Sequence, residues 1–355
     1  MQEKILRKPV ENSAVTVISD DEVSEGKVLP SFAHPAPRRL HHLDFMDIYI
    51  CLEGDGRAHY RPRVLKKDGL PDIDVPEEYL EDVEKLAAHL RQSFVGVEKG
   101  LTYDGVRLRA SKLKSAAGST WAAMRRVPDL PPRLNDLGFI PQLPPLLREL
   151  GKRDGLILLC GATGNGKTTT SSSLLLEYLE SYGGVAFTIE DPVEYCLDGR
   201  QGQAGYCYQS EIEEEEQWGQ MLKRSLRWHP RYIFVGEIRT PDAANQLLRA
   251  ATSGHTVITT MHAGSMEEAL EGLLQLAEVE LGDRAPLLLA AGLTAVVHQN
   301  LTPLGIKAGF MVTEADNPGS PIRALIRDKR IGQTRTFSDQ QMALLTRTGK
   351  IFQPR

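Results

Sequence analysis

The stretch Gly161-Ala162-Thr163-Gly164-Asn165-Gly166-Lys167-Thr168 decides the fold of this chain. It has the pattern G-x-x-x-x-G-K-[ST], which is the phosphate-binding P-loop. A short apolar run from Leu156 to Cys160 precedes it, and Thr169 to Tyr182 follows with the composition of a helix. A buried strand, a glycine-rich turn and a helix form the context that the motif needs. The sequence therefore predicts a nucleotide site here rather than a glycine-rich turn before an ordinary helix.

The residues of the motif have distinct roles in holding phosphate. Glycines let backbone N–H groups turn toward phosphate oxygens, and the helix N-terminus adds positive potential. We expect Lys167 to reach the β- and γ-phosphates and the Thr168 hydroxyl to coordinate Mg²⁺, so the predicted ligands are ATP and Mg²⁺. The predicted nucleotide-binding residues of this stretch are Gly161, Ala162, Thr163, Gly164, Asn165, Gly166, Lys167, Thr168 and Thr169.

The composition is that of a soluble protein with two globular domains. The chain has 355 residues, 41% of them hydrophobic and 25% charged. A net charge of −5 gives no overall attraction to nucleic acid. Four scattered cysteines without a C-x-x-C pair favour a reducing cytoplasm over a zinc module or a disulfide framework. We see no signal peptide, and the apolar run from Ala285 to Val297 is too short to span a bilayer. A membrane role would therefore require a partner.

The chain divides into four predicted segments. Residues 1–42 form an irregular lead-in, 43–128 a small α+β domain, 129–133 a linker stiffened by prolines, and 134–355 an α/β domain. In the small domain, Met46 to Leu52 and Val106 to Ser111 alternate like half-buried strands, and Thr120 to Arg126 is expected to pair with the second of them. The apolar positions from Leu80 to Phe94 recur at helical spacing.

Apolar strands alternate with helical stretches in the second domain. After the strand that precedes the P-loop, we expect strands at Val185 to Ile189, Tyr232 to Val235 and Thr256 to Thr260. This alternation predicts a mostly parallel sheet with helices on both faces. Ligands bind such sheets at the carboxyl ends of the strands, so the polar residues that follow each strand are candidates for the site.

Carboxylates and histidines stand at those strand ends. Glu190, Asp191 and Glu194 follow one strand, and burying three carboxylates together is costly unless a cation neutralises them; a solvated acidic turn is the alternative. Glu237 follows the next strand in a Walker B arrangement in which glutamate replaces the usual aspartate. His255 and His262 bracket the fourth strand, where they would sense the γ-phosphate, bridge to a neighbouring subunit, or be structural.

These segments, taken in order, resemble a known family. They are similar to the Walker A, Asp, Walker B and His boxes of the type II/type IV secretion ATPases, and the size and lack of a tetracysteine motif favour PilT-like pilus retraction ATPases. Pro321 to Asp328 resembles the A-I-R-N-L-I-R-E motif of PilT-like members, and Met46 to Ile50 resembles the segment that opens the family's N-terminal domain. The resemblance covers about residues 43 to 333.

The resemblance implies an architecture and a function. It implies a RecA-like P-loop core after a smaller PAS-like domain, assembled as a homo-hexameric, cytoplasmic ATPase at the inner-membrane face of a pilus or secretion machine. Its partner would be an inner-membrane platform protein, and ATP hydrolysis would power type IV pilus dynamics.

The resemblance also assigns roles to individual residues. Glu194 would polarise the attacking water, Glu237 would act at the metal together with Thr168, and Glu190 would belong to the nucleotide site. His255 and His262 would form the His box. Arg109 and Arg125 would approach the nucleotide phosphates from the N-terminal domain, which fits a basic strand face.

Two other functions stay open. One is a type IV secretion or conjugation ATPase of the same superfamily. The other is an accessory subunit that binds ATP, hardly hydrolyses it and modulates a paralogous motor. Departures from the family pattern at Ser210, Arg231 and Thr240 motivate the second. A nucleic-acid helicase lacks support, because no basic stripe with interleaved aromatic residues is present.

Overall fold

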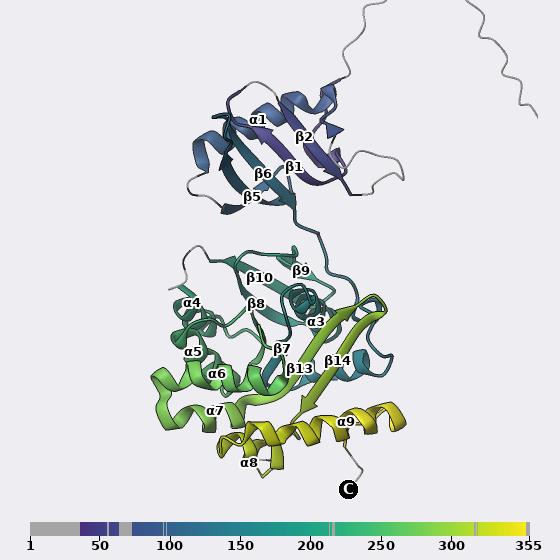
Figure 1. The fold of residues 1–355 in the computed structure, drawn as a ribbon, viewed down its shortest axis with the longest axis vertical. Coiled ribbons are helices and arrows are strands. Elements are labelled where there is room, and N and C mark those ends of the chain that lie inside the picture. Colours follow the sequence, from purple (N-terminus) through teal and green to yellow (C-terminus); the bar gives the residue numbers. More distant parts are fainter. Residues whose placement is uncertain are drawn as a thin grey trace, which may run out of the picture. The chain divides into compact units, whose positions relative to one another are not determined.

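The computed structural model describes residues 36–355, apart from 55–56, 64–72, 95, 97, 213, 215–216, 316, 318 and 353–355. Two sheets organise these residues, an N-terminal sheet and a C-terminal sheet (Figure 1). Among the described residues, no helix combines the length and the apolar character that crossing a bilayer requires.

The N-terminal sheet is antiparallel, with strand order β3-β2-β1-β6-β5-β4. Its strands are β1 (Phe45–Cys51), β2 (Ala58–Pro62), β3 (Ile73–Asp74), β4 (Glu98–Tyr103), β5 (Val106–Lys114) and β6 (Thr120–Arg126). Helix α1 (Glu77–Ser93) covers one face and buries Val83, Leu86 and Leu90 against it. Alternation along β1 places Ile48 and Ile50 in the same core, as the period of two requires.

The predicted lead-in ends earlier than residue 42. Leu40 and Leu43 are buried in the N-terminal core, and residues Leu40–His42 form a 3₁₀ turn. The backbone N–H of Leu40 donates a 2.8 Å hydrogen bond to the Asp82 carboxylate on α1. Burying these apolar side chains is favourable, so this part of the chain packs against the N-terminal core instead of remaining irregular. Residues 1–35 of the predicted lead-in lie outside the described residues.

The C-terminal sheet is mixed and mostly parallel, as predicted, with strand order β14-β13-β7-β12-β11-β8-β10-β9. Five neighbouring pairs are parallel, and the two edge pairs β13–β14 and β9–β10 are antiparallel, in the described part of the chain. Its strands are β7 (Gly155–Cys160), β8 (Gly184–Glu190), β9 (Gly199–Gln201), β10 (Gly205–Glu211), β11 (Tyr232–Val235), β12 (Thr256–Met261), β13 (Leu293–Thr302) and β14 (Gly305–Val312).

Helices cover both faces of this sheet (Figure 1). They are α2 (Leu143–Glu149), α3 (Lys167–Tyr182), α4 (Gln217–Ser225), α5 (Pro241–Ala251), α6 (Met266–Leu281), α7 (Ala285–Gly292), α8 (Pro321–Arg327) and α9 (Arg335–Thr348). Strand β7 shows why two covers are needed. Leu156 and Leu158 pack with α4 to α8, whereas Ile157 and Leu159 pack with α2, α3 and α9. A strand buried on both faces reads as a continuous apolar run.

The predicted linker, residues 129–133, lies between β6 and the first turn that leads into the C-terminal sheet. Its end is attached to the P-loop helix. Ser173 Oγ on α3 donates a 2.7 Å hydrogen bond to the Pro132 carbonyl, and the Glu177 carboxylate accepts one of 2.9 Å from the Leu134 N–H. A hinge in this segment, which stays a prediction, would therefore have to lie before Pro132.

Candidate nucleotide-binding site

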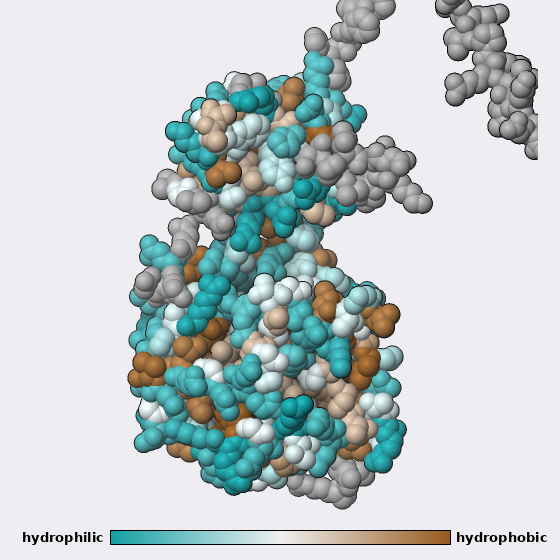
Figure 2. Space-filling view, in the orientation of Figure 1, coloured by the Kyte–Doolittle hydropathy of each residue, from teal (hydrophilic) through white to brown (hydrophobic). Residues whose placement is uncertain are grey.

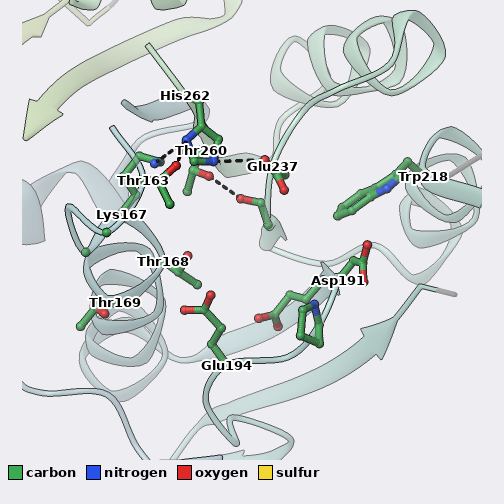
Figure 3. Close-up of a pocket in the computed structure, with 15 residues that line it drawn as sticks. Thr163, Lys167, Thr168, Thr169, Asp191, Glu194, Trp218, Glu237, Thr260 and His262 are labelled. Carbon is green, nitrogen blue, oxygen red and sulfur yellow. Dashed lines mark hydrogen bonds and ion pairs between the residues drawn. The ribbon is translucent and has the colours of Figure 1, made fainter. Parts of the chain in front are cut away.

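A pocket of about 390 Å³ lies at the edge of the C-terminal sheet where β7, β8, β11 and β12 end (Figure 3). We call it the P-loop pocket. The following side chains and backbone groups line it: Thr163, Gly164, Gly166, Lys167, Thr168, Thr169, Glu190, Asp191, Pro192, Glu194, Trp218, Gly236, Glu237, Thr260 and His262. The parallel strands bring their carboxyl ends to one edge, which is why four separate segments of the sequence meet here.

Glycines give the P-loop its shape. Gly164 and Gly166 have φ of 78° and 74°, in the left-handed region that glycine adopts without strain. Gly161 is needed for a different reason, because a Cβ there would stand 2.4 Å from the Gln299 carbonyl oxygen on β13. Gln299 also braces the loop by donating a 2.6 Å hydrogen bond from Nε2 to the Asn165 carbonyl. The loop is thus shaped by its own glycines and by the neighbouring strand.

Lys167 is the first residue of α3 and is buried at the pocket. Its ammonium group donates hydrogen bonds to the carbonyls of Gly161 (2.9 Å) and Ala162 (3.1 Å). Burial lowers the pKa of Lys167, and the Glu237 carboxylate opposes this shift. Gly161 and Ala162 thus contribute carbonyl oxygens to the lysine. Asn165 does not line the pocket; its side-chain oxygen accepts a 3.3 Å hydrogen bond from the Leu301 N–H.

His262 stands between the lysine and the Walker B carboxylate (Figure 3). Its Nδ1 lies 3.4 Å from Lys167 Nζ and 3.3 Å from Thr163 Oγ1, and its Nε2 lies 3.6 Å from Glu237 Oε2. The other oxygen of Glu237 pairs with the Arg239 guanidinium. His262 therefore connects the P-loop lysine to the carboxylate that follows β11 through a chain of polar contacts.

Two glutamates stand at the end of β8, Glu190 as its last residue and Glu194 on the loop that follows, and their environments differ. Glu190 is 2% exposed, and burial raises its pKa to about 7, against hydrogen bonds from Thr188 and Gln209. Glu194 is on the loop, exposed, and extends toward Thr168 (Figure 3). Desolvation raises its pKa, and a hydrogen bond with Thr168 opposes the shift. The pocket thus holds one buried carboxyl and one accessible carboxylate.

The pocket's oxygen ligands suit Mg²⁺. The Thr168 hydroxyl and the Glu237 carboxylate are the hard donors that this ion prefers. Within the described residues, no group of three or more His, Cys, Asp or Glu side chains is placed to hold a metal. A site with few protein ligands fits Mg²⁺, because this ion usually keeps water and binds substrate phosphates.

His255 does not join this pocket, which corrects the expectation that both histidines belong to the nucleotide site. It immediately precedes β12, whereas His262 immediately follows it. A six-residue strand spans about 20 Å. The two histidines therefore lie at opposite ends of β12. His255 Nδ1 lies 2.6 Å from the Pro230 carbonyl oxygen.

Arg109 and Arg125 are partners across β5 and β6 of the N-terminal sheet. They share one face of that sheet, as the alternating strand pattern predicts. The Arg125 guanidinium donates to the buried Asp47 carboxylate at 2.7 Å and 3.3 Å. Among the described residues that line the P-loop pocket, neither arginine is included. Their approach to a nucleotide stays a prediction.

Sequence reasoning missed several pocket residues, among them Trp218 and Thr260. Trp218 comes from α4, which follows an acidic run and carries no motif. Thr260 is the penultimate residue of β12, and its hydroxyl donates 2.6 Å to the Gly236 carbonyl. A signal for Thr260 existed, because it stands near the end of a predicted strand whose neighbour carries the Walker B carboxylate.

Comparisons with known proteins show which family this chain is similar to. Residues 97–329 match the model of the family described as type II/IV secretion system protein. The uncharacterized protein YggR of Escherichia coli K12 is 30% identical over 264 residues, which are 72% of this chain and 76% of YggR. A twitching motility protein of Neisseria gonorrhoeae is 28% identical over 210 residues, 56% of this chain and 55% of that protein. The pilus retraction ATPase PilT of Pseudomonas aeruginosa is 31% identical over 183 residues, 50% of this chain and 52% of PilT.

Solved structures share the fold. The pilus retraction motor PilT with bound ADP has a TM-score of 0.64 and 25% identity, and the alignment covers 88% of this chain and 92% of that one. The ATPase DotB of Legionella pneumophila also has a TM-score of 0.64, at 20% identity over 90% and 95% of the two chains, and supports the fold alone. The predicted α/β fold is thereby confirmed. Since the family match covers well over half of the chain, the protein belongs to the type II/IV secretion ATPase family and is PilT-like.

Proposed function

We propose that this protein is a motor ATPase that hydrolyses ATP to power type IV pilus dynamics, in the manner of a retraction motor. One observation carries the proposal. Lys167 with Thr168, Glu194 and Glu237 come from three separate segments of the sequence and meet in the P-loop pocket. Phosphoryl transfer requires positioning and charge neutralisation rather than covalent catalysis, and these groups supply both.

The side chains divide the work of hydrolysis. The Lys167 ammonium exchanges its two carbonyl partners for phosphate oxygens when ATP binds. Thr168 and Glu237 would hold Mg²⁺, which would neutralise charge on the phosphates. Glu194 orients the attacking water and accepts its proton, and its raised pKa makes it a better base than an ordinary glutamate. His262, between Lys167 and Glu237, is placed to respond to the γ-phosphate.

The wider setting follows from the resemblance to PilT. We propose a homo-hexamer at the cytoplasmic face of the inner membrane, working on a platform protein of the pilus machine. In this assembly Arg109 and Arg125 bring positive charge to the phosphates, and nucleotide binding closes one domain on its neighbour. A type IV secretion or conjugation machine served by the same superfamily is the alternative.

Mg²⁺-dependent ATP hydrolysis by the purified protein tests the proposal. The assay is run over a series of protein concentrations, with Lys167→Ala and Glu194→Gln as variants. Lys152→Ala is the matched control, because Lys152 pairs with Glu149 at the surface of the same domain. We expect no hydrolysis from Lys167→Ala, bound but slowly hydrolysed ATP from Glu194→Gln, and wild-type rates from the control.

Each outcome decides between the functions. A rate per subunit that rises with protein concentration supports sites shared between subunits. Full steady-state activity in either site variant contradicts the residue assignments. Tight ATP binding by the wild type without turnover, at every concentration, would favour the accessory subunit over the motor.

A further inference from the structure

Gln209, on β10, is bonded to the loop that carries Glu194. Its side-chain Oε1 accepts a 2.5 Å hydrogen bond from the Leu197 N–H. Its Nε2 donates to the Tyr195 carbonyl at 3.0 Å and to the Glu190 carboxyl at 2.9 Å. A single amide thus contacts the last residue of β8, which precedes the loop, and two residues that closely follow Glu194.

Other contacts attach the same loop, residues 191–198, to its surroundings. The backbone N–H of Gln209 donates 2.9 Å to the Asp198 carboxylate, and Gln201 Nε2 donates 2.9 Å to the Leu197 carbonyl. Tyr195 OH and Thr169 Oγ1 lie 3.1 Å apart, which links the loop to the P-loop helix. Because its backbone makes few regular ladder bonds, the loop depends on side chains for its shape.

The register of two strands brings Gln209 to this position. Strands β8 and β10 are parallel, and Gln209 pairs with Thr188. Thr188 Oγ1 donates 2.7 Å to the same Glu190 oxygen that accepts from Gln209. The Glu194 backbone N–H also bonds to the Glu190 carboxyl. Glu190 and Gln209 therefore form one polar support beneath Glu194.

Only a side-chain amide meets this demand. It accepts at one atom and donates at the other, whereas a carboxylate only accepts and an aliphatic side chain does neither. Glutamate in place of Gln209 would face both the Tyr195 carbonyl and the Glu190 carboxyl without a proton to offer. The chemistry of the position is therefore specific to an amide.

We propose that Gln209 is a positioning residue for hydrolysis, holding the 191–198 loop so that the Glu194 carboxylate stays beside Thr168 in the P-loop pocket. The inference rests on the hydrolytic role proposed for Glu194. A misplacement of about 1 Å can cost about 100-fold in rate. Because Gln209 is not among the described residues that line the P-loop pocket, its loss should leave nucleotide affinity intact.

Steady-state kinetics of Gln209→Ala and Gln209→Glu test the role. We expect kcat to fall about 10- to 100-fold in both, with KM and the affinity for ADP within about two-fold of wild type. Gln246→Ala is the control, because Gln246 is also half-buried in the same domain and its side-chain amide donates a hydrogen bond to Asp242 on its own helix. An unchanged kcat in Gln209→Ala would overturn the proposal, and so would a loss of ADP affinity equal to the loss of rate.

A double variant shows whether Gln209 acts through Glu194. Residues that act as a unit are not additive, so Gln209→Ala should cause no further loss in the Glu194→Gln background. Additive losses would overturn the proposed route.

Hydrogen exchange keeps the inference testable if the wild type does not turn over ATP. In Gln209→Ala, amides of the 193–198 segment should exchange faster, and those of the P-loop helix should not change. Unchanged exchange in that segment would overturn the positioning role, whereas wild-type inactivity alone would overturn only the proposed function.

Discussion

Replacing Glu190 with glutamine should change how the stability of this protein depends on pH. Glu190 is buried, and its pKa is raised from 4.5 to about 7 because burial disfavours the charged carboxylate. Glutamine has nearly the same shape and can still accept the hydrogen bonds from Thr188 and Gln209 at one oxygen. The substitution therefore removes the titration while keeping most of the packing.

The magnitude follows from linkage. In the folded protein Glu190 holds its proton more tightly than in the unfolded chain. Ionising the buried carboxyl therefore destabilises the folded state, by almost nothing below pH 4.5 and by the full amount above pH 7. Each pKa unit is worth about 1.4 kcal/mol, which gives about 3 kcal/mol for the whole window. Wild type should lose this amount relative to Glu190→Gln as the pH rises, about 1 kcal/mol by pH 5 and about 3 kcal/mol by pH 8.

A constant offset accompanies this trend. The Glu194 N–H bonds to the Glu190 carboxyl, and an amide placed there can lose that bond at a cost of about 1 kcal/mol. This cost does not depend on pH. The decisive quantity is therefore the change between pH 5 and pH 8 in the difference of unfolding free energies.

Urea unfolding at the two pH values measures that change. Trp218 and Trp228 both lie in the domain of the C-terminal sheet and report its unfolding by fluorescence. The control is Glu271→Gln, at an exposed glutamate on α6, which should shift stability by no more than about 0.5 kcal/mol at either pH. A difference between wild type and Glu190→Gln that stays the same from pH 5 to pH 8 would refute the reasoning.

Three further substitutions probe the scaffold of the site. Leu158→Ala should lower the free energy of unfolding by about 3 to 4 kcal/mol, since the side chain is fully buried; a loss below about 1 kcal/mol in urea titrations would contradict this. Gly161→Ala should weaken ADP binding at least about 10-fold, which corresponds to about 1.4 kcal/mol, because the new Cβ would overlap the Gln299 carbonyl. The circular dichroism spectrum should not change. Wild-type affinity would show that the loop can move to accommodate the methyl group. Glu177→Ala should cost about 3 kcal/mol, because Arg148 and the Leu134 N–H lose a buried partner; thermal unfolding at the wild-type temperature would rule this out.

The strands nearest the P-loop were predictable because burial on both faces leaves a clear pattern. The runs at 156–160 and 232–235 are apolar, the run at 256–260 consists of β-branched residues, and the three match β7, β11 and β12 closely. In a parallel sheet, the motif that follows such a strand must stand at the edge that binds ligands. The positions of Lys167 and Glu237 in the pocket were therefore available from the sequence.

The edge strands were not predictable in the same way. Strand β10 alternates buried Cys207 with the exposed side chains of Tyr206 and Tyr208, and its antiparallel partner β9 has three residues. The apolar run from Ala285 to Val297 reads as one segment but divides after Gly292 into α7 and β13. Long-range pairing, rather than local composition, decides these elements.

Register also determines which side chains support Glu194. A slip of one residue between β8 and β10 would turn Gln209 to the opposite face of the sheet and leave the 191–198 loop without its amide. The sequence displays the Glu194 motif, but nothing in it fixes the alignment of two polar strand ends. The supporting residue could be found only in the folded chain.

The three departures from the family pattern can now be placed, and they bear on the choice between motor and accessory subunit. Ser210 follows Gln209 on β10 and so points to the opposite face. Arg231 precedes β11, at the edge away from the P-loop, and packs on the ring of Tyr232. Thr240 caps α5 by accepting from the Ala243 N–H. None of the three is among the described residues that line the P-loop pocket. The substitutions that suggested weak hydrolysis therefore lie outside the groups that would perform it, and this favours the motor.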